Sequence, residues 1–251
     1  MENEEGIEKL FFELASESRL GILCKLNEKN LKMKDIARKL DLTTTETFRQ
    51  LQRLSEALLV QKHPEGTYAI TQYGKLVLQL SASLEFVSKH KEYFSTHDIW
   101  RLPYQFVNRI GELSQTTLIM DRINCMQMAE KMFREAEQFT WGMREGSALE
   151  AIAPIFYEQI RKGVKFKDIF PESDLPAYRT WSEKCRNLEW RCLAVSDIPA
   201  IIMVTEKEAT LSLRFNGGRM DYLAGFFGKD PAFLNWVKDL FLYYWEKGNR
   251  F

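Results

Sequence analysis

The sequence predicts an α+β winged helix–turn–helix domain, followed by an α/β sensor-like domain with a mixed sheet flanked by helices. Two short amphipathic helices and a hairpin follow one another between residues 33 and 71, and strand and helix patterns alternate after residue 94. A chain of 251 residues also suits two domains. We expect the winged helix–turn–helix domain over 1–73, a helical linker over 74–93 and a regulatory domain over 94–251.

The first domain centres on a pair of helices. The first helix is expected over 34–40, where apolar residues recur at helical spacing. Thr43 is the expected N-cap of the second helix, and Glu46 stands three residues later, as in a capping box. The positions of the second helix expected to face the core are Thr47, Phe48, Leu51, Leu54 and Leu58.

A hairpin is expected next, with strands Val60–Lys62 and Thr67–Ile70 around Pro64-Glu65-Gly66. Such an order forms a helix–turn–helix with a wing, whose second helix enters the major groove of DNA. The predicted base-reading residues, on the exposed N-terminal half of that helix, are Thr44, Thr45, Arg49 and Gln50. The predicted phosphate-contacting residues are Lys34, Arg53, Lys62 and His63. An alternative stays open, in which the winged helix contacts transcription machinery and reads no bases.

Three segments of this domain carry a family resemblance. LASESRLGILCKL (14–26) resembles the opening helices of ArsR-type regulators, and LTTTETFRQLQRL (42–54) resembles their recognition helix. Tyr68–Thr71 followed by Tyr73-Gly74 resembles the end of their wing. The resemblance implies a transcriptional regulator that binds double-stranded DNA. ArsR-family metal sensors carry Cys pairs or His/Asp clusters near these helices, whereas this region has only Cys24, so no metal site is expected.

The charge distribution favours a nucleic-acid partner. The whole chain has 35 basic and 35 acidic residues, but from Arg19 to Lys62 there are ten basic residues against five acidic ones. A local excess of basic residues can contact DNA phosphates. Because the whole chain is neutral, we expect little non-specific binding to DNA.

Composition indicates a soluble cytoplasmic protein. No apolar run approaches the roughly 20 residues that a membrane-spanning helix needs, so no membrane partner is expected. Cys24, Cys125, Cys185 and Cys192 lack the spacing of a zinc ribbon or a redox C-x-x-C, although Cys185 and Cys192 could meet across a turn. We predict no cofactor.

A long helix is expected over Tyr73–Tyr93, because no Gly or Pro interrupts its apolar pattern after Gly74. Its apolar stripe consists of Leu76, Leu80, Leu84 and Val87. Such a stripe packs either on its own domain or on the same helix of a second copy. We favour a homodimer, because two winged helices are needed to read two half-sites.

Strand and helix patterns alternate in the regulatory domain. Strands are expected at Thr116–Met120, Glu137–Arg144, Val164–Phe170, Trp190–Val195, Ile201–Thr205 and Ala209–Phe215. Helices are expected from an Asn124 cap to Glu135, from a Ser147 cap to Gly163, around Ala177–Asn187 and after Asp230-Pro231. This alternation is typical of an α/β sheet with helices on its faces.

Two motifs relate this region to a second family. Phe94-Ser95-x-His97-Asp98-Ile99, with Pro103 downstream, opens it, and an aromatic-rich run from Phe226 to Trp245 closes it. In these motifs the region from about Tyr93 to Phe251 resembles the C-terminal domain of archaeal methanogenesis-regulatory proteins of the FilR type. Sugar-responsive TrmB-type regulators resemble it more distantly. The resemblance implies an effector-sensing regulatory domain.

No catalytic residue is predicted. No histidine begins the His-x-Lys-x4-Asp signature of enzymes with an overlapping fold class, and no Gly-rich phosphate loop, serine elbow or His-Glu-x-x-His is present. We expect no enzyme, and catalysis in this domain is the less favoured alternative. A small-molecule effector would need polar groups near strand ends, where Arg144 or Arg214 could bind a carboxylate or phosphate. The candidate effector-binding residues are Trp141, Arg144, Glu145, Asp168, Arg214 and Asn216.

Overall fold

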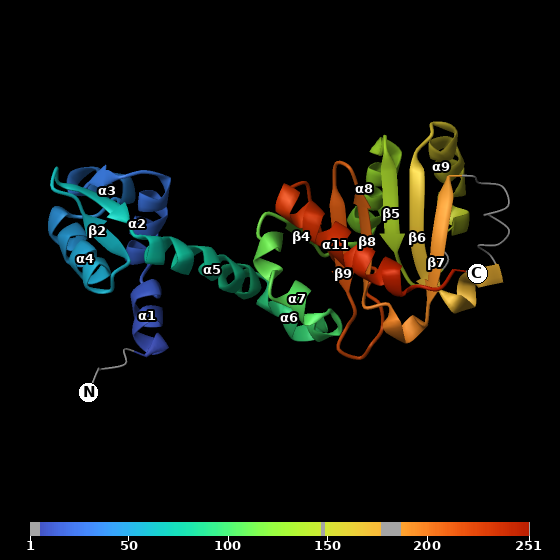
Figure 1. Ribbon diagram of the computed structural model, residues 1–251, viewed down its shortest axis with the longest axis horizontal. Coiled ribbons are helices and arrows are strands. Elements are labelled where there is room, and N and C mark those ends of the chain that lie inside the picture. The colour runs from blue at the N-terminus through green and yellow to red at the C-terminus, as the bar shows by residue number, and fades with distance from the viewer. Residues whose placement is uncertain (1–5, 147–148, 177–186, 251) are drawn as a thin grey trace. The chain divides into compact units, whose positions relative to one another are not determined.

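The computed structural model describes residues 6–146, 149–176 and 187–250. It divides the chain into two compact units, Met1–Ala82 and Ser83–Phe251, which are described separately (Figure 1). The boundary falls within the segment that the sequence predicts as a helical linker. Within the described ranges, no helix has the length and apolar character needed to cross a membrane.

The first unit is a winged helix–turn–helix. Its elements are α1 (Ile7–Leu14), α2 (Glu17–Glu28), β1 (Leu31–Lys32), α3 (Met33–Leu40), α4 (Thr44–Glu56), β2 (Val60–Lys62), β3 (Thr67–Ile70) and the first part of α5 (Gln72–Lys89). The antiparallel sheet has the order β1-β3-β2, with Val60 opposite Ile70 and Leu31 opposite Tyr68. Both helices and the hairpin of the wing are confirmed, whereas the two-residue strand β1 was not predicted.

The helix α4 begins and ends at identifiable signals. The Thr43 hydroxyl accepts a 3.1 Å hydrogen bond from the Glu46 amide, so the predicted N-cap is confirmed. After the helix, Leu58 adopts a left-handed φ of 58°, and the Leu59 amide donates to the Leu54 carbonyl at 2.9 Å, which closes the last turn.

Two expected core positions of α4 are wrong. Leu58 is 69% exposed because the left-handed turn points it away from the core. Phe48 is 54% exposed because it lies on the same helix face as Thr44 and Thr45. The core that α4 shares with α2, α3 and the sheet includes Ile22, Leu23, Leu26, Leu31, Ile36, Leu51, Leu54, Leu59, Val60 and Tyr68.

The second unit is built on one mixed sheet. Its strands are β4 (Thr117–Ile119), β5 (Phe139–Met143), β6 (Lys165–Pro171), β7 (Leu188–Leu193), β8 (Ala200–Thr205), β9 (Ala209–Leu213) and β10 (Gly225–Gly228). Their order is β4-β10-β9-β8-β5-β6-β7, in which β5, β6 and β7 are parallel and the other neighbours are antiparallel.

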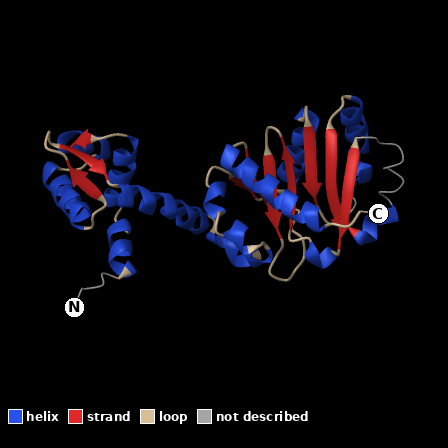
Figure 2. Cartoon of the chain, viewed as in Figure 1, coloured by secondary structure: helices blue, strands red, loops and turns tan. Residues whose placement is uncertain are grey.

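Helices cover this sheet (Figures 1 and 2). They are α6 (Lys91–Thr96), α7 (Tyr104–Val107), α8 (Arg122–Glu135), α9 (Leu149–Arg161) and α11 (Pro231–Lys247), with short 3-10 turns η1 (Ile99–Arg101), η2 (Ile110–Leu113), η3 (Glu172–Asp174) and η4 (Val195–Asp197). Asp230 caps α11 by accepting from the Ala232 amide at 3.0 Å, as its Asp-Pro start predicts. The α11 residues buried against the sheet include Phe233, Trp236, Val237, Leu240 and Phe241.

Most elements of this unit agree with the sequence pattern, within a few residues. The strand β10 was not predicted, and Asp121 rather than Asn124 caps α8, accepting from the Asn124 amide at 2.8 Å. The expected cap Ser147 and nearly all of the helix expected around Ala177–Asn187 lie outside the described residues.

Candidate nucleic-acid interface and effector residues

One face of α4 is exposed and polar. Thr44, Thr45 and Arg49 lie on it, as predicted, together with the unexpected Phe48. Their spacing of one and four residues places them on adjacent turns of one helix surface. Within the described part of the chain Arg49 has no ion-pair partner, so its guanidinium group is available to a base or a phosphate.

Gln50 does not belong to this exposed face. It is 7% exposed, and its Oε1 accepts a 3.0 Å hydrogen bond from Nη1 of Arg19 on α2. Arg19 also donates to the carbonyl oxygens of Phe12 at 2.6 Å and Glu13 at 2.8 Å. The expectation that Gln50 is exposed for base reading is therefore wrong, because its carboxamide joins α2 to α4.

Arg53 is also held within the protein. Its guanidinium group makes an ion pair of 2.6 Å with the Glu13 carboxylate on α1 and lies 4.9 Å from the centre of the Phe12 ring. The hydrogen bond to Glu13 raises the pKa of Arg53. A phosphate contact by Arg53 would have to compete with this carboxylate.

The remaining predicted phosphate contacts are accessible. Lys34 on α3 and Lys62 on β2 are exposed, and His63 beside them is half-buried. The His63 amide donates to the Thr67 carbonyl at 2.8 Å, which fixes the base of the wing, and Gly66 turns its tip with a φ of 84°.

The candidate effector residues of the second unit form two ion pairs rather than one pocket. Arg144 follows β5 and contacts Asp168 of β6 at 2.6 Å, and Glu145 contacts Arg214 at 2.6 Å. Arg214 is 4% exposed and also donates to the carbonyl oxygens of Ile198, Gly218 and Val195 at 2.6 to 3.0 Å. Each of its three guanidinium nitrogens therefore already donates to a carbonyl oxygen, and a ligand carboxylate would need to displace Glu145.

Trp141 and Asn216 do not join these ion pairs. Trp141 pairs in register with Lys167, so it lies on the opposite sheet face from Asp168. Asn216 is exposed, and its side-chain amide donates to the Ser95 carbonyl at 2.9 Å.

The sequence did not predict several exposed apolar side chains of the second unit. Met120, Ile123 and Met126 at the β4–α8 junction are 59 to 66% exposed, and Tyr222 and Leu223 are about half exposed. The Tyr222 hydroxyl donates to the Glu145 carbonyl. Burial, followed by the nearby Glu145 carboxylate, raises the pKa of Tyr222. Because these residues come from two distant segments, 120–126 and 222–223, no local pattern in the sequence relates them.

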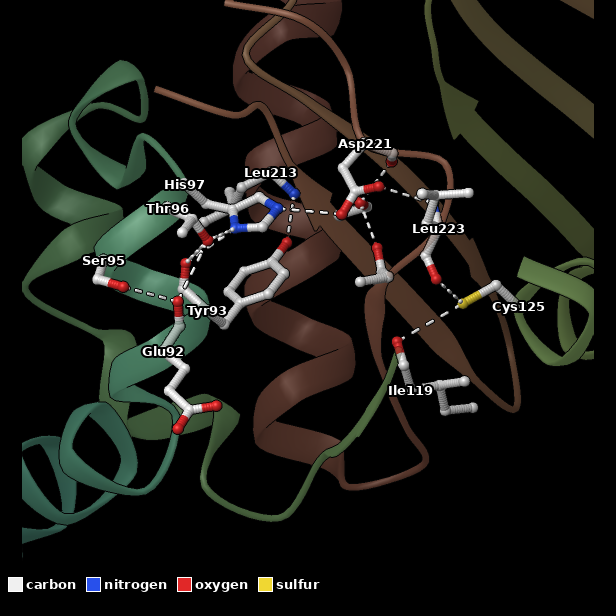
Figure 3. A network of polar contacts seen from close by, with 12 residues as sticks. Glu92, Tyr93, Ser95, Thr96, His97, Ile119, Cys125, Leu213, Asp221 and Leu223 are labelled. Carbon is white, nitrogen blue, oxygen red and sulfur yellow. Dashed lines mark hydrogen bonds and ion pairs between the residues drawn. The ribbon is translucent and has the colours of Figure 1, made fainter. Parts of the chain in front are cut away.

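A buried histidine–aspartate pair supports the same loop (Figure 3). Nε2 of His97, at the end of α6, lies 3.0 Å from Oδ2 of Asp221, and both side chains are 3% exposed. Nδ1 of His97 lies 2.8 Å from the Tyr93 carbonyl, and the two rings stack at 3.7 Å. Asp221 also accepts from the Leu223 amide at 2.7 Å. The pair thus fixes the loop that carries Tyr222 and Leu223.

Fold and surface together define a winged helix–turn–helix unit joined to an α/β unit with a mixed sheet. No family model matches the chain, and no curated protein sequence matches it. Three similar solved structures are TrmBL2, an archaeal chromatin protein with a novel mode of DNA binding, NucT from Helicobacter pylori, and reduced HlyU from Vibrio cholerae.

These structural likenesses are distant. TrmBL2 is 16% identical, with 98% of this chain and 97% of that chain covered and a TM-score of 0.45. NucT is 13% identical, with 54% and 98% covered and a TM-score of 0.45. HlyU is 26% identical, with 30% and 84% covered and a TM-score of 0.28. All three scores are below 0.5, so none of them assigns a function to this chain.

Proposed function

We propose that this chain is a transcriptional regulator that acts as a homodimer and reads the major groove of double-stranded DNA with α4. The observation that supports it most is the exposed face of Thr44, Thr45 and Arg49 on a helix whose other side is fixed in the core. An arginine can bind guanine through two hydrogen bonds, and threonine hydroxyls accept or donate to base edges. Lys34 and Lys62 supply phosphate contacts on either side of this helix.

The homodimer rests on α5. Leu76, Leu80, Leu84 and Val87 recur along one stripe of this helix and are 39 to 65% exposed. An exposed stripe of this kind loses contact with water when it packs on a second copy. Two winged helices can then read two half-sites.

Effector sensing by the second unit completes the proposal. Arg144 and Glu145 follow the carboxyl end of β5, and the hydroxyl of the half-exposed Tyr222 donates to the Glu145 carbonyl. An effector could replace one of these ion pairs with a contact of its own. The protein conformation that binds the effector more tightly then becomes more populated. The archaeal ArsR-like and FilR-type assignment rests on the motifs at residues 14–26, 42–54, 68–74, 94–103 and 226–245. We assign no catalytic activity to either unit.

Fluorescence anisotropy on DNA from the region upstream of the protein's own gene tests this function. Arg49→Ala is expected to weaken specific binding by about 1–3 kcal/mol, the cost of one lost bidentate base contact. Lys91→Ala, an exposed cation in the second unit, is the matched control and should leave specific affinity unchanged. Equal affinity of wild type and Arg49→Ala would remove the base-reading role.

A second candidate function is protein contact through the same face of α4. The exposed ring of Phe48 favours it, because large apolar side chains often anchor protein interfaces. Under this alternative, Phe48→Ala abolishes capture of RNA polymerase or a general transcription factor, and the upstream DNA binds no better than random DNA.

A further inference from the structure

One face of the second unit's sheet combines basic and aromatic side chains. Register places Phe139 beside Lys165, and Trp141 beside Lys167, on the same side of β5 and β6. Arg191 pairs with Ile169 on that side of β7. In Figure 1, α11 lies across the middle strands of this face and leaves most of β6 and β7 uncovered by any drawn helix.

The cations on this face lie against rings. Nζ of Lys167 is 5.6 Å from the centre of Trp141 and 5.0 Å from that of Trp245 on α11. The guanidinium carbon of Arg191 is 4.7 Å from the Trp245 ring, and Nζ of Lys238 is 5.2 Å from the Phe139 ring. Trp141 is fixed in turn by stacking on Phe241 at 5.3 Å. The rings therefore hold the charged groups in defined positions on the sheet.

These cations have no carboxylate counter-ion among the described residues. Within the described ranges, no ion pair involves Lys165, Lys167, Arg191 or Lys238, and the exposed Glu189 is the acid that shares their strand face there. Some other cations of the same unit are paired, such as Lys162 with Glu158 at 2.7 Å and Arg134 with Glu130 at 2.8 Å. This face therefore carries a local excess of positive charge, although the whole chain has no net charge.

Arg191 is tied to the end of α11. Its Nη1 donates to the Trp245 carbonyl, but Nε is buried and has no hydrogen-bond partner in the described structure.

We propose that this sheet face binds the phosphodiester backbone of nucleic acid, as a contact site separate from α4. Four cations spread over β6, β7 and α11 suit a polymer with repeating anionic groups better than one small anion. The half-buried rings of Phe139 and Trp141 present apolar edges to bases or sugars, as in proteins that combine basic and aromatic side chains on one surface. An acidic peptide would satisfy the charges but offers no comparable flat apolar groups.

Anisotropy titrations of the full chain with random-sequence oligonucleotides test the proposal. The background variant Lys34→Ala/Arg49→Ala removes contacts of the winged helix. In that background, Lys165→Gln/Lys167→Gln removes two charges from the sheet face. The matched control Lys131→Gln/Lys162→Gln removes two exposed lysines that pair with Glu135 and Glu158.

Binding should persist in the background variant and fall in the sheet-face variant, but not in the control. The slope of log affinity against log salt should decrease by about 1.8 for a duplex or about 1.4 for a single strand, at ~0.9 or ~0.7 per lost phosphate contact. Duplex and single-stranded probes identify which form the face prefers. Should the Lys167 substitution prevent folding, Lys165→Gln/Lys238→Gln replaces it. Equal affinities and slopes for the sheet-face and control variants, with both probes, would overturn the proposal.

Discussion

Nη1 of Arg19 donates a 3.0 Å hydrogen bond to Oε1 of Gln50, and each residue is only 7% exposed. This contact joins α2 to the core side of α4. It sets the rotation of α4 about its own axis, because Gln50 has to face inward for the bond to form. The residues directly before Gln50, Phe48 and Arg49, point outward as a result of that rotation.

Gln50→Leu should therefore reduce stability rather than DNA recognition. The substitution leaves a buried donor of Arg19 without its acceptor and should lower the free energy of unfolding by about 1–3 kcal/mol. Urea denaturation measures this loss, and anisotropy measures the affinity of the folded protein for DNA. Gln52→Leu is the matched control, because the Gln52 carboxamide is exposed and donates to Glu56 on the same helix. Unchanged stability with weakened DNA binding would restore Gln50 as a base-reading residue.

Phe48→Ala should weaken specific DNA binding without destabilising the fold. The ring is 54% exposed, so its removal should change the free energy of unfolding by no more than about 0.5 kcal/mol. An apolar ring on a recognition helix can contact the methyl group of thymine. Replacing thymine by uracil in the bound DNA should then weaken wild type more than Phe48→Ala. Leu54→Ala, a core control, should instead cost about 2–5 kcal/mol of stability. An identical uracil effect in wild type and variant would exclude the methyl contact.

Leu80→Glu/Leu84→Glu should convert a dimer to a monomer. Both side chains are more than half exposed on α5, so two carboxylates there should repel a second copy while leaving each chain folded. Sedimentation equilibrium measures the mass, and Gln79→Glu, beside the stripe on the same helix, is the control. The α5 interface is ruled out if the double variant sediments as the wild-type dimer does.

Asp221→Ala should destabilise the second unit strongly. It removes the partner of His97 and the acceptor of the Leu223 amide in a site that is 3% exposed, a loss of about 3–5 kcal/mol for a broken buried pair. Asp221→Asn should recover part of this loss. Nδ1 of His97 faces the Tyr93 carbonyl and has to carry a hydrogen, so a neutral Nε2 can accept from an asparagine amide. Thermal unfolding distinguishes the variants, and equal midpoints for Ala and Asn would contradict this hydrogen-bond assignment.

Glu206→Gln should flatten the acid dependence of stability. Burial acts to raise the pKa of Glu206, but hydrogen bonds from the amides of Glu137, Phe139 and Gln138 outweigh it and hold that pKa below its ordinary value. A depressed folded-state pKa gives stability that is complete above the unfolded value of 4.5 and is lost as the pH falls through the folded value. Wild type should therefore lose its advantage over Glu206→Gln on acidification. A constant difference between them from pH 7 to pH 3 would contradict this.

Local signals predicted the winged helix with its bounds nearly correct. Thr43 with Glu46 marks the start of α4, and Pro64-Glu65-Gly66 marks the turn of the wing, because capping and turn formation depend on neighbouring residues. The orientation of Gln50 could not be predicted in this way. It depends on Arg19, thirty-one residues earlier, and on a buried hydrogen bond that outweighs the usual preference of glutamine for solvent.

In the second unit, sequence periodicity predicted most strands, but it did not predict which strands pair with one another. Trp141 and Asp168 both follow the pattern of strand residues, yet strand register places them on opposite faces of the sheet. Arg214 and Glu145 form an ion pair across distant segments, so each looked accessible to a ligand when considered alone. β10 escaped prediction because its four residues, Gly225–Gly228, include two glycines, which are unfavourable in strands.

The position of β4 at the edge of the sheet has a consequence for how the chain is synthesised. Residue 119 of β4 pairs with residue 225 of β10, so the ribosome has to complete most of the second unit before this strand finds its neighbour. The sheet of the first unit needs no residue beyond Ile70. The winged helix can therefore form while the rest of the chain is still being translated. Aggregation, and the need for chaperones, should be greatest while the second unit is only partly synthesised.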